Sequence, residues 1–267
     1  MPQNPLFLAT AVEAVVQAGA IQLEKFGGEF RVDKKGAIDL VTEVDVQVER
    51  MFRALVSRRF PDHQVLAEEM GGDAAAPKGP CWIFDPIDGT TNFTHGLPIF
   101  CASLALEIDG VAEVAAVYDP TRKELFTAER GGGAYLNGRP LRVSRTRSLV
   151  DAMLVTGFPY DVHNRIDEIV GLFGRFVGRA RAVRRLGSAA IDLCYIAAGR
   201  MDGFWERDLK PWDIAGGALI VAEAGGRITN MDGRPFVSRG RDVLATNGLL
   251  HDDMLGVIAD FVRGSSS

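Results

Sequence analysis

The first hydrophobic pattern along the chain has the spacing of an amphipathic helix. Apolar and small residues recur every three or four positions between Leu8 and Leu23, while Glu13 and Glu24 fall on the opposite side. One apolar stripe with this period is typical of a helix that packs on a core. The pattern therefore predicts a helix at the start of the chain that ends near Gly27.

A second amphipathic helix is predicted to begin after Thr42. The hydroxyl of Thr42 is suited to cap a helix, and Asp45, three residues later, has the position that completes a capping box. Pro61 ends this helix, because proline cannot continue the backbone hydrogen bonds. The predicted apolar stripe consists of Val48, Met51, Phe52 and Leu55.

Two short apolar runs follow, and each one stops at acidic residues. The run from Gln64 to Ala67 precedes Glu68 and Glu69. The run from Cys81 to Phe84 precedes Asp85. Short apolar runs with such boundaries are consistent with buried strands. We therefore expect carboxylates at the ends of two strands.

From Phe100 onwards the pattern becomes that of an antiparallel meander. Asp109-Gly110 and Asn137-Gly138 are dipeptides that favour tight hairpin turns. Between and before these turns lie apolar runs rich in residues that favour strands. We predict strands over Cys101 to Ile108, Val111 to Tyr118 and Glu124 to Ala128.

Beyond about Ser148 the predicted strands and helices alternate. The segments are Ala152 to Thr156, Ile166 to Val177, Ala182 to Leu186, Ala189 to Ala198, Gly203 to Glu206 and Ile214 to Ala224. The chain contains neither a linker-like stretch nor a repeat of fixed period. We therefore expect a mixed α/β fold in which residues 1–267 form a single domain, with subregions at about 1–147 and 148–267.

The composition excludes several classes of protein. The chain has 267 residues, 47% of them hydrophobic, and its 30 Lys and Arg residues against 35 Asp and Glu residues give a formal net charge of −5. A mildly acidic chain lacks the basic face that broad binding to nucleic acids or anionic membranes requires. We expect no direct binding to nucleic acid and no binding to membranes.

The cysteines and the N-terminal segment predict a cytoplasmic protein. Cys81, Cys101 and Cys194 cannot all pair, and none has the C-x-x-C spacing of a zinc or redox site. Residues 1–8 lack the positive region of a signal peptide. Charged or turn residues interrupt every apolar run before it reaches the ~20 residues of a membrane span.

The segment from Trp82 to Phe93 contains the most informative chemistry. Asp85 and Asp88 flank a proline, and Gly89 permits a tight reversal before a helix that we predict to start at Thr90. The two carboxylates then converge, and converging carboxylates repel each other unless a cation lies between them. Oxygen ligands without cysteine or histidine favour Mg²⁺ over zinc.

Each of these acidic residues also has a purely structural interpretation. Asp-Pro and Asp-Gly are common turn signals, so Asp85 and Asp88 could be solvated loop residues. Asp213, which follows Pro211-Trp212, could simply interact with a helix dipole. Asp45 could serve only in the capping box.

Two longer motifs give the chain a resemblance to the inositol monophosphatase family, and within it to the bacterial, extragenic-suppressor type. They are Asp85-Pro-Ile-Asp-Gly-Thr-Thr-Asn-Phe93 and Trp212-Asp213-Ile-Ala-Gly, which continues to Glu223-Ala-Gly-Gly226. Further segments are similar to family landmarks in the same order. These are residues 40–45, 68–69, 118–120, 129–131, 136–138, 187–189 and 203–206.

The resemblance implies a Mg²⁺-dependent phosphomonoesterase with two or three metal ions. The metal ligands that it implies are Glu68, Asp85, the Ile87 carbonyl, Asp88 and Asp213. Thr90, beside Asp45, matches a hydroxyl that helps to polarise the attacking water, so Asp45, Glu68 and Thr90 are the expected catalytic residues. Metal-activated water needs no protein nucleophile, and the sequence has neither a G-x-S-x-G elbow nor a His-x-x-x-His pair.

The resemblance also implies a set of substrate-binding residues. Glu206 matches a glutamate that accepts hydrogen bonds from a sugar or polyol hydroxyl. Lys34 matches a lysine near the active-site loop, with an ordinary surface lysine as the alternative. The complete expected set is Asp88, Gly89, Thr90, Thr91, Gly187, Ser188, Ala189, Glu206 and Asp213.

The family further implies a layered α-β-α-β-α sandwich of the inositol monophosphatase and fructose-1,6-bisphosphatase type, a homodimer and sensitivity to Li⁺. The leading hypothesis is hydrolysis of inositol-1-phosphate or a similar polyol monophosphate. Relatives on this scaffold act on histidinol phosphate, fructose 1,6-bisphosphate or 3′-phosphoadenosine 5′-phosphate, and histidinol phosphate is the second choice here. Arg184 and Arg185 either bind a second anionic group of the substrate or lie on a solvated strand face.

A hypothesis of another class is a contact with the transcription antitermination machinery, which bacterial relatives of this type are known to join. Arginines that could supply a basic surface occur in two runs. These are Arg139, Arg142, Arg145 and Arg147, and Arg175, Arg179, Arg181, Arg184 and Arg185. Such runs are more often solvated faces.

Overall fold

A seven-stranded sheet is built from the first half of the chain. The structure, a computed structural model, describes residues 4–36, 39–72 and 78–264. Neighbouring strands of this sheet are antiparallel except for the parallel pair β3–β4. In spatial order the strands are β3 (Gln64–Ala67), β4 (Pro80–Asp88), β5 (Cys101–Ile108), β6 (Val111–Asp119), β7 (Glu124–Glu129), β8 (Gly133–Leu136) and β9 (Arg139–Pro140). A separate pair is formed by β1 (Val32–Lys34) and β2 (Leu40–Thr42).

A second, five-stranded sheet is built from the second half of the chain. Strand β10 runs parallel to both of its neighbours, whereas β14 is antiparallel to both of its own. In spatial order the strands are β11 (Ala182–Arg184), β10 (Met153–Thr156), β12 (Gly203–Glu206), β14 (Val243–Thr246) and β13 (Arg227–Thr229).

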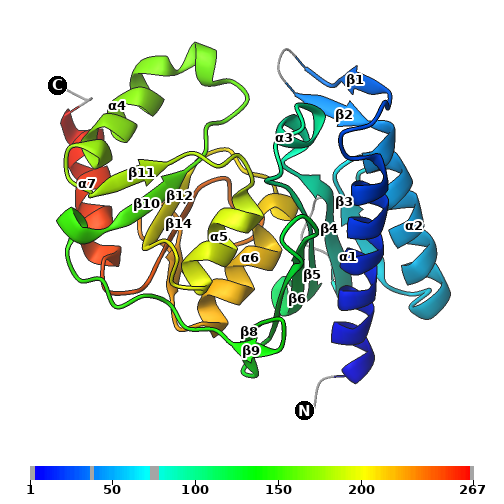
Figure 1. The fold of residues 1–267 in the computed structure, drawn as a ribbon. Helices are drawn as coiled ribbons and strands as arrows, with labels where there is room; N and C mark the ends of the chain where they lie inside the picture. The colour runs from blue at the N-terminus through cyan, green and yellow to red at the C-terminus, as the bar shows by residue number, and fades with distance from the viewer. Residues whose placement is uncertain (1–3, 37–38, 73–77, 265–267) are drawn as a thin grey trace.

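Helices form three layers around and between the two sheets (Figure 1). Helices α1 (Pro5–Lys25) and α2 (Glu43–Arg59) cover the outer face of the large sheet, and α5 (Ala189–Ala197) and α6 (Pro211–Glu223) lie between the sheets. Helices α4 (Ile166–Val177) and α7 (His251–Gly264) cover the outer face of the small sheet. The short elements are α3 (Thr90–Thr94), η1 (Leu149–Asp151) and η2 (Val162–Asn164). The expected α-β-α-β-α sandwich is therefore confirmed.

Each interface between layers has its own apolar core. Val15, Phe52 and Trp82 are fully buried between the outer helices and the large sheet. Ile191, Leu193 and Ile220 belong to the core between the two sheets. Phe176 and Trp205 pack their rings 4.1 Å apart beneath α4. The chain thus buries apolar surface on both faces of each sheet.

The capping box predicted at Thr42 is confirmed. The Thr42 hydroxyl accepts hydrogen bonds from the backbone N–H groups of Val44 (3.1 Å) and Asp45 (3.3 Å). In return, the Asp45 carboxylate accepts from the Thr42 backbone N–H at 2.7 Å. The predicted stripe faces the core, with Val48, Phe52 and Leu55 buried. Met51 packs at its margin.

The last part of the chain contains elements that the sequence patterns do not predict. These are β13, β14 and α7. Strand β4 is also longer than expected, because it continues through Asp85 to Asp88 rather than stopping at Phe84. The predicted helix after Gly89 and the long helix over residues 166–177 are confirmed.

Helix α1 is long and apolar enough to cross a membrane by length and composition alone, contrary to the expectation from the sequence. One face of it is nevertheless fully buried by the fold. Ala11, Ala14, Val15 and Ala18 have no exposed surface, and the helix packs on α2 and on strands β5 and β6. In this structure the apolar residues of α1 thus form part of the hydrophobic core.

We predict that a side chain at Gly19 destabilises the fold. A Cβ atom at this position on α1 would lie 2.6 Å from the Tyr118 ring and 3.1 Å from Pro120. Overpacking of this kind costs about 1–3 kcal/mol, so Gly19→Val should lower the free energy of unfolding in urea by that amount.

Gly256 on α7 provides the matched control. A Cβ atom there meets no other atom within 4 Å, so Gly256→Ala should raise the free energy of unfolding by about 0.5–1 kcal/mol. Equal unfolding midpoints for Gly19→Val and the wild type would show that α1 does not pack on β6 as described.

Candidate active site

An irregularity in β4 brings two carboxylates to the same side of the strand. Successive side chains in a regular strand alternate between faces, so residues three apart should point to opposite faces. The pairing of β4 with β5 shifts between Asp85 and Asp88, and the Ile87 backbone N–H donates to Asp85 Oδ1 at 2.9 Å. Bulges of this kind redirect side chains, and both carboxylates line one pocket.

The turn after β4 requires a glycine. Gly89 has a φ angle of 102°, and a Cβ atom there would lie 2.9 Å from the Ile99 carbonyl oxygen. The next residue, Thr90, donates from its hydroxyl to the Ile87 carbonyl oxygen at 2.9 Å. Helix α3 begins at Thr90, so the helix start and both carboxylates of β4 lie together.

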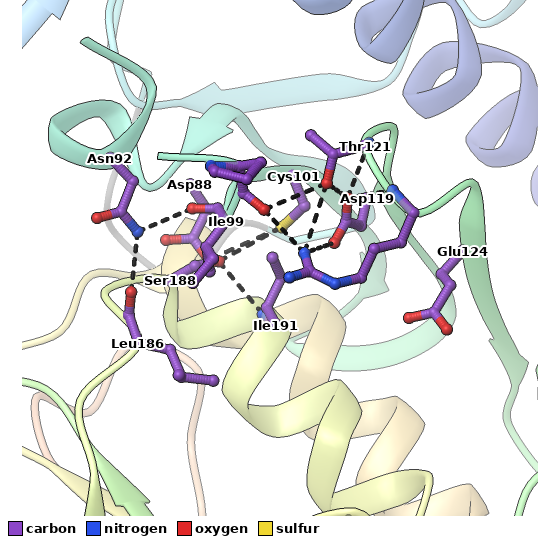
Figure 2. A network of polar contacts seen from close by, with 12 residues as sticks. Asp88, Asn92, Ile99, Cys101, Asp119, Thr121, Glu124, Leu186, Ser188 and Ile191 are labelled. Carbon is purple, nitrogen blue, oxygen red and sulfur yellow. Dashed lines mark hydrogen bonds and ion pairs between the residues drawn. The ribbon is translucent and has the colours of Figure 1, made fainter. Parts of the chain in front are cut away.

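The N-terminus of α5 holds the carboxylate of Asp88 (Figure 2). Asp88 Oδ2 accepts from the Ser188 hydroxyl and from the Ala190 backbone N–H, both at 2.7 Å. Ser188 is the N-cap of α5 and also accepts from the Ile191 N–H. The start of a helix between the two sheets thus stabilises a carboxylate on the large sheet.

The side chain of Asn92 links α3 to the loop before α5 by hydrogen bonds. Its amide nitrogen donates to the carbonyl oxygens of Ile99 (2.8 Å) and Leu186 (2.9 Å), as Figure 2 shows. The segment containing Gly187 and Ser188 is therefore tied to the segment that follows β4.

The second half of the chain contributes two further acidic residues to the pocket. Glu206 is the last residue of β12, and Asp213 lies in the first turn of α6. The Lys210 backbone N–H donates to Asp213 Oδ2 at 2.7 Å. The intervening loop is tied down by Asp208, which pairs with Arg165 and, at 2.6 Å, with Arg241.

Glu68 approaches the same pocket together with a lysine. The Lys35 ammonium group lies 2.8 Å from Glu68 Oε1 and 2.6 Å from Glu69 Oε1. The turn that contains these acids is anchored by the fully buried carboxylate of Glu49, which accepts from the backbone N–H groups of Glu69 (2.7 Å) and Met70 (3.0 Å).

The pocket at this junction has a volume of about 240 Å³. It brings together every site residue expected from the sequence except Asp45. The members of that set are Glu68, Asp85, Ile87, Asp88, Gly89, Thr90, Thr91, Gly187, Ser188, Ala189, Glu206 and Asp213. Residues from both halves of the chain therefore share one site.

Asp45 lies beside the pocket without lining it. One oxygen of its buried carboxylate serves the capping box, whereas Oδ1 has no hydrogen-bond partner among the described residues. Burial, together with the nearby charge of Glu68, raises the pKa of Asp45 to about 7. The capping role that the sequence allows for Asp45 is thus present in the structure.

In each of two pairs of neighbouring basic residues, only one member lines the pocket. Lys34, which matches the family lysine, is exposed on β1, and Lys35 lines the pocket instead. Arg185 also lines the pocket, whereas Arg184 is exposed and donates only to the Val183 carbonyl oxygen among the contacts described. Sequence reasoning did not identify Lys35, Glu49 or a further pocket residue, Asp192. Glu49 could have been identified from the sequence, because it is a charged residue directly beside Val48 in the apolar stripe of α2.

Burial and mutual repulsion perturb the carboxylates of the site. Burial, and then the charges of Glu68, Asp88 and Asp213, hold the pKa of Asp85 well above its ordinary range. Burial raises the pKa of Asp88 to about 6, despite its hydrogen bonds to Ser188 and Ala190. A cation among these groups would relieve the repulsion.

The chemistry of the donor set fits a hard divalent cation. The described residues that line the pocket offer carboxylate, carbonyl and hydroxyl oxygens and include neither histidine nor cysteine, which is the preference of Mg²⁺. No three His, Cys, Asp or Glu side chains within the described ranges form a ready-made metal-binding group. Glu68, Asp88 and Asp213 are instead held by Lys35 and by the starts of α5 and α6. A bound cation therefore has to compete with these partners.

The fold and this acidic pocket define a phosphatase of the layered α/β class, and comparisons with known proteins agree. A profile of the inositol monophosphatase family matches residues 4–263. An inositol-1-monophosphatase from Synechocystis is 46% identical, covering 96% of this chain and 93% of the relative. A protein named Nus factor SuhB from Salmonella typhimurium is 40% identical, covering 95% of this chain and 96% of the relative.

Solved structures give the same result. The extragenic suppressor protein SuhB from Bartonella henselae superposes with a TM-score of 0.89 at 36% identity, covering 95% of this chain and 98% of the other. The inositol monophosphatase of Thermotoga maritima superposes with a TM-score of 0.87 at 36% identity, covering 96% and 98%. The chain belongs to the inositol monophosphatase family.

We predict that removing the Lys35 ammonium group weakens the metal-free fold and strengthens the response to Mg²⁺. Lys35→Met leaves Glu68 and Glu69 without their positive partner, which costs on the order of 1 kcal/mol. The melting temperature in EDTA should fall by about 2–4 °C, and the rise on adding MgCl₂ should exceed that of the wild type, because the ammonium no longer competes with the cation.

Lys34→Met is the matched control, since it removes the exposed neighbouring lysine. It should leave both melting temperatures as in the wild type. The same Mg²⁺ response in Lys35→Met and the wild type would contradict competition between Lys35 and the cation.

Proposed function

We propose that this protein is a Mg²⁺-dependent phosphomonoesterase that releases phosphate from inositol-1-phosphate or a similar polyol monophosphate. The observation that carries the proposal is the convergence of buried and half-buried carboxylates from both halves of the chain on one pocket that contains no histidine or cysteine among its described residues. They are Glu68, Asp85, Asp88, Glu206 and Asp213. Membership of the inositol monophosphatase family supports the same activity.

The residues divide into those that hold cations and those that hold the substrate. Two or three Mg²⁺ ions would be held by Glu68, Asp85, the Ile87 carbonyl, Asp88 and Asp213. When bound, they supply a water of lowered pKa and neutralise charge on the phosphoryl group and on the leaving oxygen. Glu68, Asp45 and Thr90 would orient that water.

On the substrate side, the backbone at Gly89, Thr90 and Thr91 would bind the phosphate. The segment from Gly187 to Ala189 and the carboxylate of Glu206 would face the polyol. Burial raises the pKa of Glu206 to about 8, so a hydroxyl or a cationic group would be a favourable partner for it. We also propose that the enzyme is a homodimer, as the family resemblance implies, and that it is cytoplasmic, as its cysteine content favours. Its three cysteines are free and buried.

The first prediction for this function concerns phosphate release from a panel of phosphate esters. Inositol-1-phosphate, histidinol phosphate, fructose 1,6-bisphosphate and 3′-phosphoadenosine 5′-phosphate should be compared with Mg²⁺ and with EDTA. We expect Mg²⁺-dependent release, fastest from inositol-1-phosphate, and inhibition by LiCl in the same assay. Asp88→Asn should lower kcat by about 10²-fold or more, because it weakens a charge that acts on the reacting group.

Asp109→Asn is the matched control for this assay. Asp109 lies in the turn between β5 and β6 with a φ of 53°, which asparagine tolerates, and its Oδ1 accepts from Gly79, as an amide oxygen also can. Its activity should equal that of the wild type. Absence of release from every ester by the folded wild type would contradict the proposed function, and release that persists in EDTA would contradict its metal dependence.

A second candidate function is a contact with the transcription machinery, favoured by the relatives that carry the name Nus factor SuhB. Arg139, Arg142, Arg145 and Arg147 are exposed on the stretch of chain that begins with β9 of the large sheet and leads to the small sheet. We propose this segment as the contact surface.

Capture of RNA polymerase on the immobilised protein tests this contact. Asp88→Asn should capture as much polymerase as the wild type, because Asp88 is buried. A variant with Arg142→Glu and Arg145→Glu should capture several-fold less and should retain phosphatase activity. Equal capture by the charge-reversed variant and the wild type would exclude this surface.

A further inference from the structure

One part of the pocket, called the arm below, carries a second pair of carboxylates in addition to those of β4. Glu206 and Asp192 line this arm together with Gly157, Phe158 and Arg185. Gly157 permits the close approach of Glu206, since a Cβ atom at Gly157 would lie 2.1 Å from the Glu206 carboxylate.

Asp192 is the unexplained member of this arm. It lies in the first helical turn of α5, and its side chain is 1% exposed. Its Oδ1 atom has no hydrogen-bond partner among the described residues. Two other buried carboxylates show the contrast: Asp202 accepts from the Ser144 hydroxyl and the Met153 N–H, and Glu49 accepts from two backbone N–H groups. Asp45 also has an unpartnered oxygen, but its second oxygen serves the capping box.

An unsatisfied buried carboxylate is costly, so a structural role does not account for Asp192. Its position at the start of a helix is favourable, but the same interaction is available to an exposed acid. Burial, and then the charge of Glu206, hold the pKa of Asp192 well above its ordinary range, whereas Arg185 lowers it. Asp192 therefore lacks a hydrogen-bond donor, and a ligand bound in the pocket can supply one.

The surroundings of Asp192 define the chemistry of that donor. Glu206 offers a second acceptor in the same arm, and Arg185, whose guanidinium lies 5.8 Å from the centre of the Phe158 ring, offers donors at its edge. Two acceptors that line the same pocket suit two hydroxyl groups of one substrate. A second phosphate would meet two carboxylates with one guanidinium, so the arm disfavours bisphosphates.

We propose that Asp192 is a specificity-determining residue that accepts a hydrogen bond from a substrate hydroxyl, beside the hydroxyl held by Glu206. The inference rests on the proposed phosphatase function and deepens it, because it selects polyol monophosphates with adjacent hydroxyls. Phosphate esters without hydroxyls gain nothing from this arm.

The test compares two monophosphates, inositol-1-phosphate and phenyl phosphate, which has no hydroxyl beyond its ester. For each variant, the ratio of kcat/KM for the first to that for the second is measured together with the melting temperature. Asp192→Ala should lower the ratio at least tenfold, through a higher KM for inositol-1-phosphate. Asp192→Asn, which keeps a weaker neutral acceptor, should lower it about threefold. Neither change should lower the melting temperature, because the Asp192 side chain makes no hydrogen bond in the part of the chain that the structure describes.

Asp202→Ala is the matched control, since it removes a buried carboxylate that the protein itself satisfies. It should lower the melting temperature and leave the ratio as in the wild type. If Asp192→Ala behaves like Asp202→Ala, the role of Asp192 is structural and the inference is overturned, while phosphate release by the wild type upholds the proposed function. If the wild type releases phosphate from neither ester, the proposed function and this inference both fail.

Discussion

Repulsion among buried carboxylates is the constraint on which the rest of this structure depends. Among the acids that line the pocket, Glu68, Asp85, Asp88 and Asp213 come from three parts of the chain. Burial and mutual repulsion hold the pKa values of Asp85 and Asp213 well above the ordinary range. Carboxylates gathered in this way stay ionised only where positive charge or hydrogen-bond donors lie close to them. The fold supplies both: the ammonium of Lys35 lies against Glu68, and the starts of α5 and α6 donate to Asp88 and Asp213. The gathered acids and their partners thus form a single electrostatic unit.

The layered architecture is what allows that unit to form. Helices α5 and α6 lie between the two sheets, and residues at the start of each one line the pocket. Strand β4 of the large sheet brings Asp85 and Asp88 to the same place, and β12 of the small sheet brings Glu206. The site therefore depends on the packing of both sheets against the central helices. A substitution in the core between the sheets would therefore change the geometry of the pocket even where no pocket residue is altered.

The pocket joins two regions of different chemistry. At one end the carboxylates accompany Lys35 and the turn after β4, an arrangement that fits cations and phosphate. The other region contains the carboxylates of Glu206 and Asp192. There, Asp192 Oδ1 has no hydrogen-bond partner among the described residues. Groups that cost stability yet line a pocket indicate binding. In the proposed function, the first region would act on the phosphate ester and the second would select the alcohol. The two regions are joined through α5, whose N-cap is Ser188 and which contains Asp192.

Much of the fold could be predicted from sequence, because the relevant information is local, and most of the site residues were expected because they match family motifs. The spacing of apolar residues in α1 and α4, the capping box of Thr42 and the turn at Gly89 depend on residues within a few positions of one another, and so does the motif from Asp85 to Asp88. Only the tertiary structure decided which member of a neighbouring pair faces the pocket, Lys35 rather than Lys34 and Arg185 rather than Arg184. It also decided that Asp192 is buried without a partner. These outcomes depend on contacts between segments that lie far apart in the chain, such as Ser188 with Asp88, and no local pattern records them.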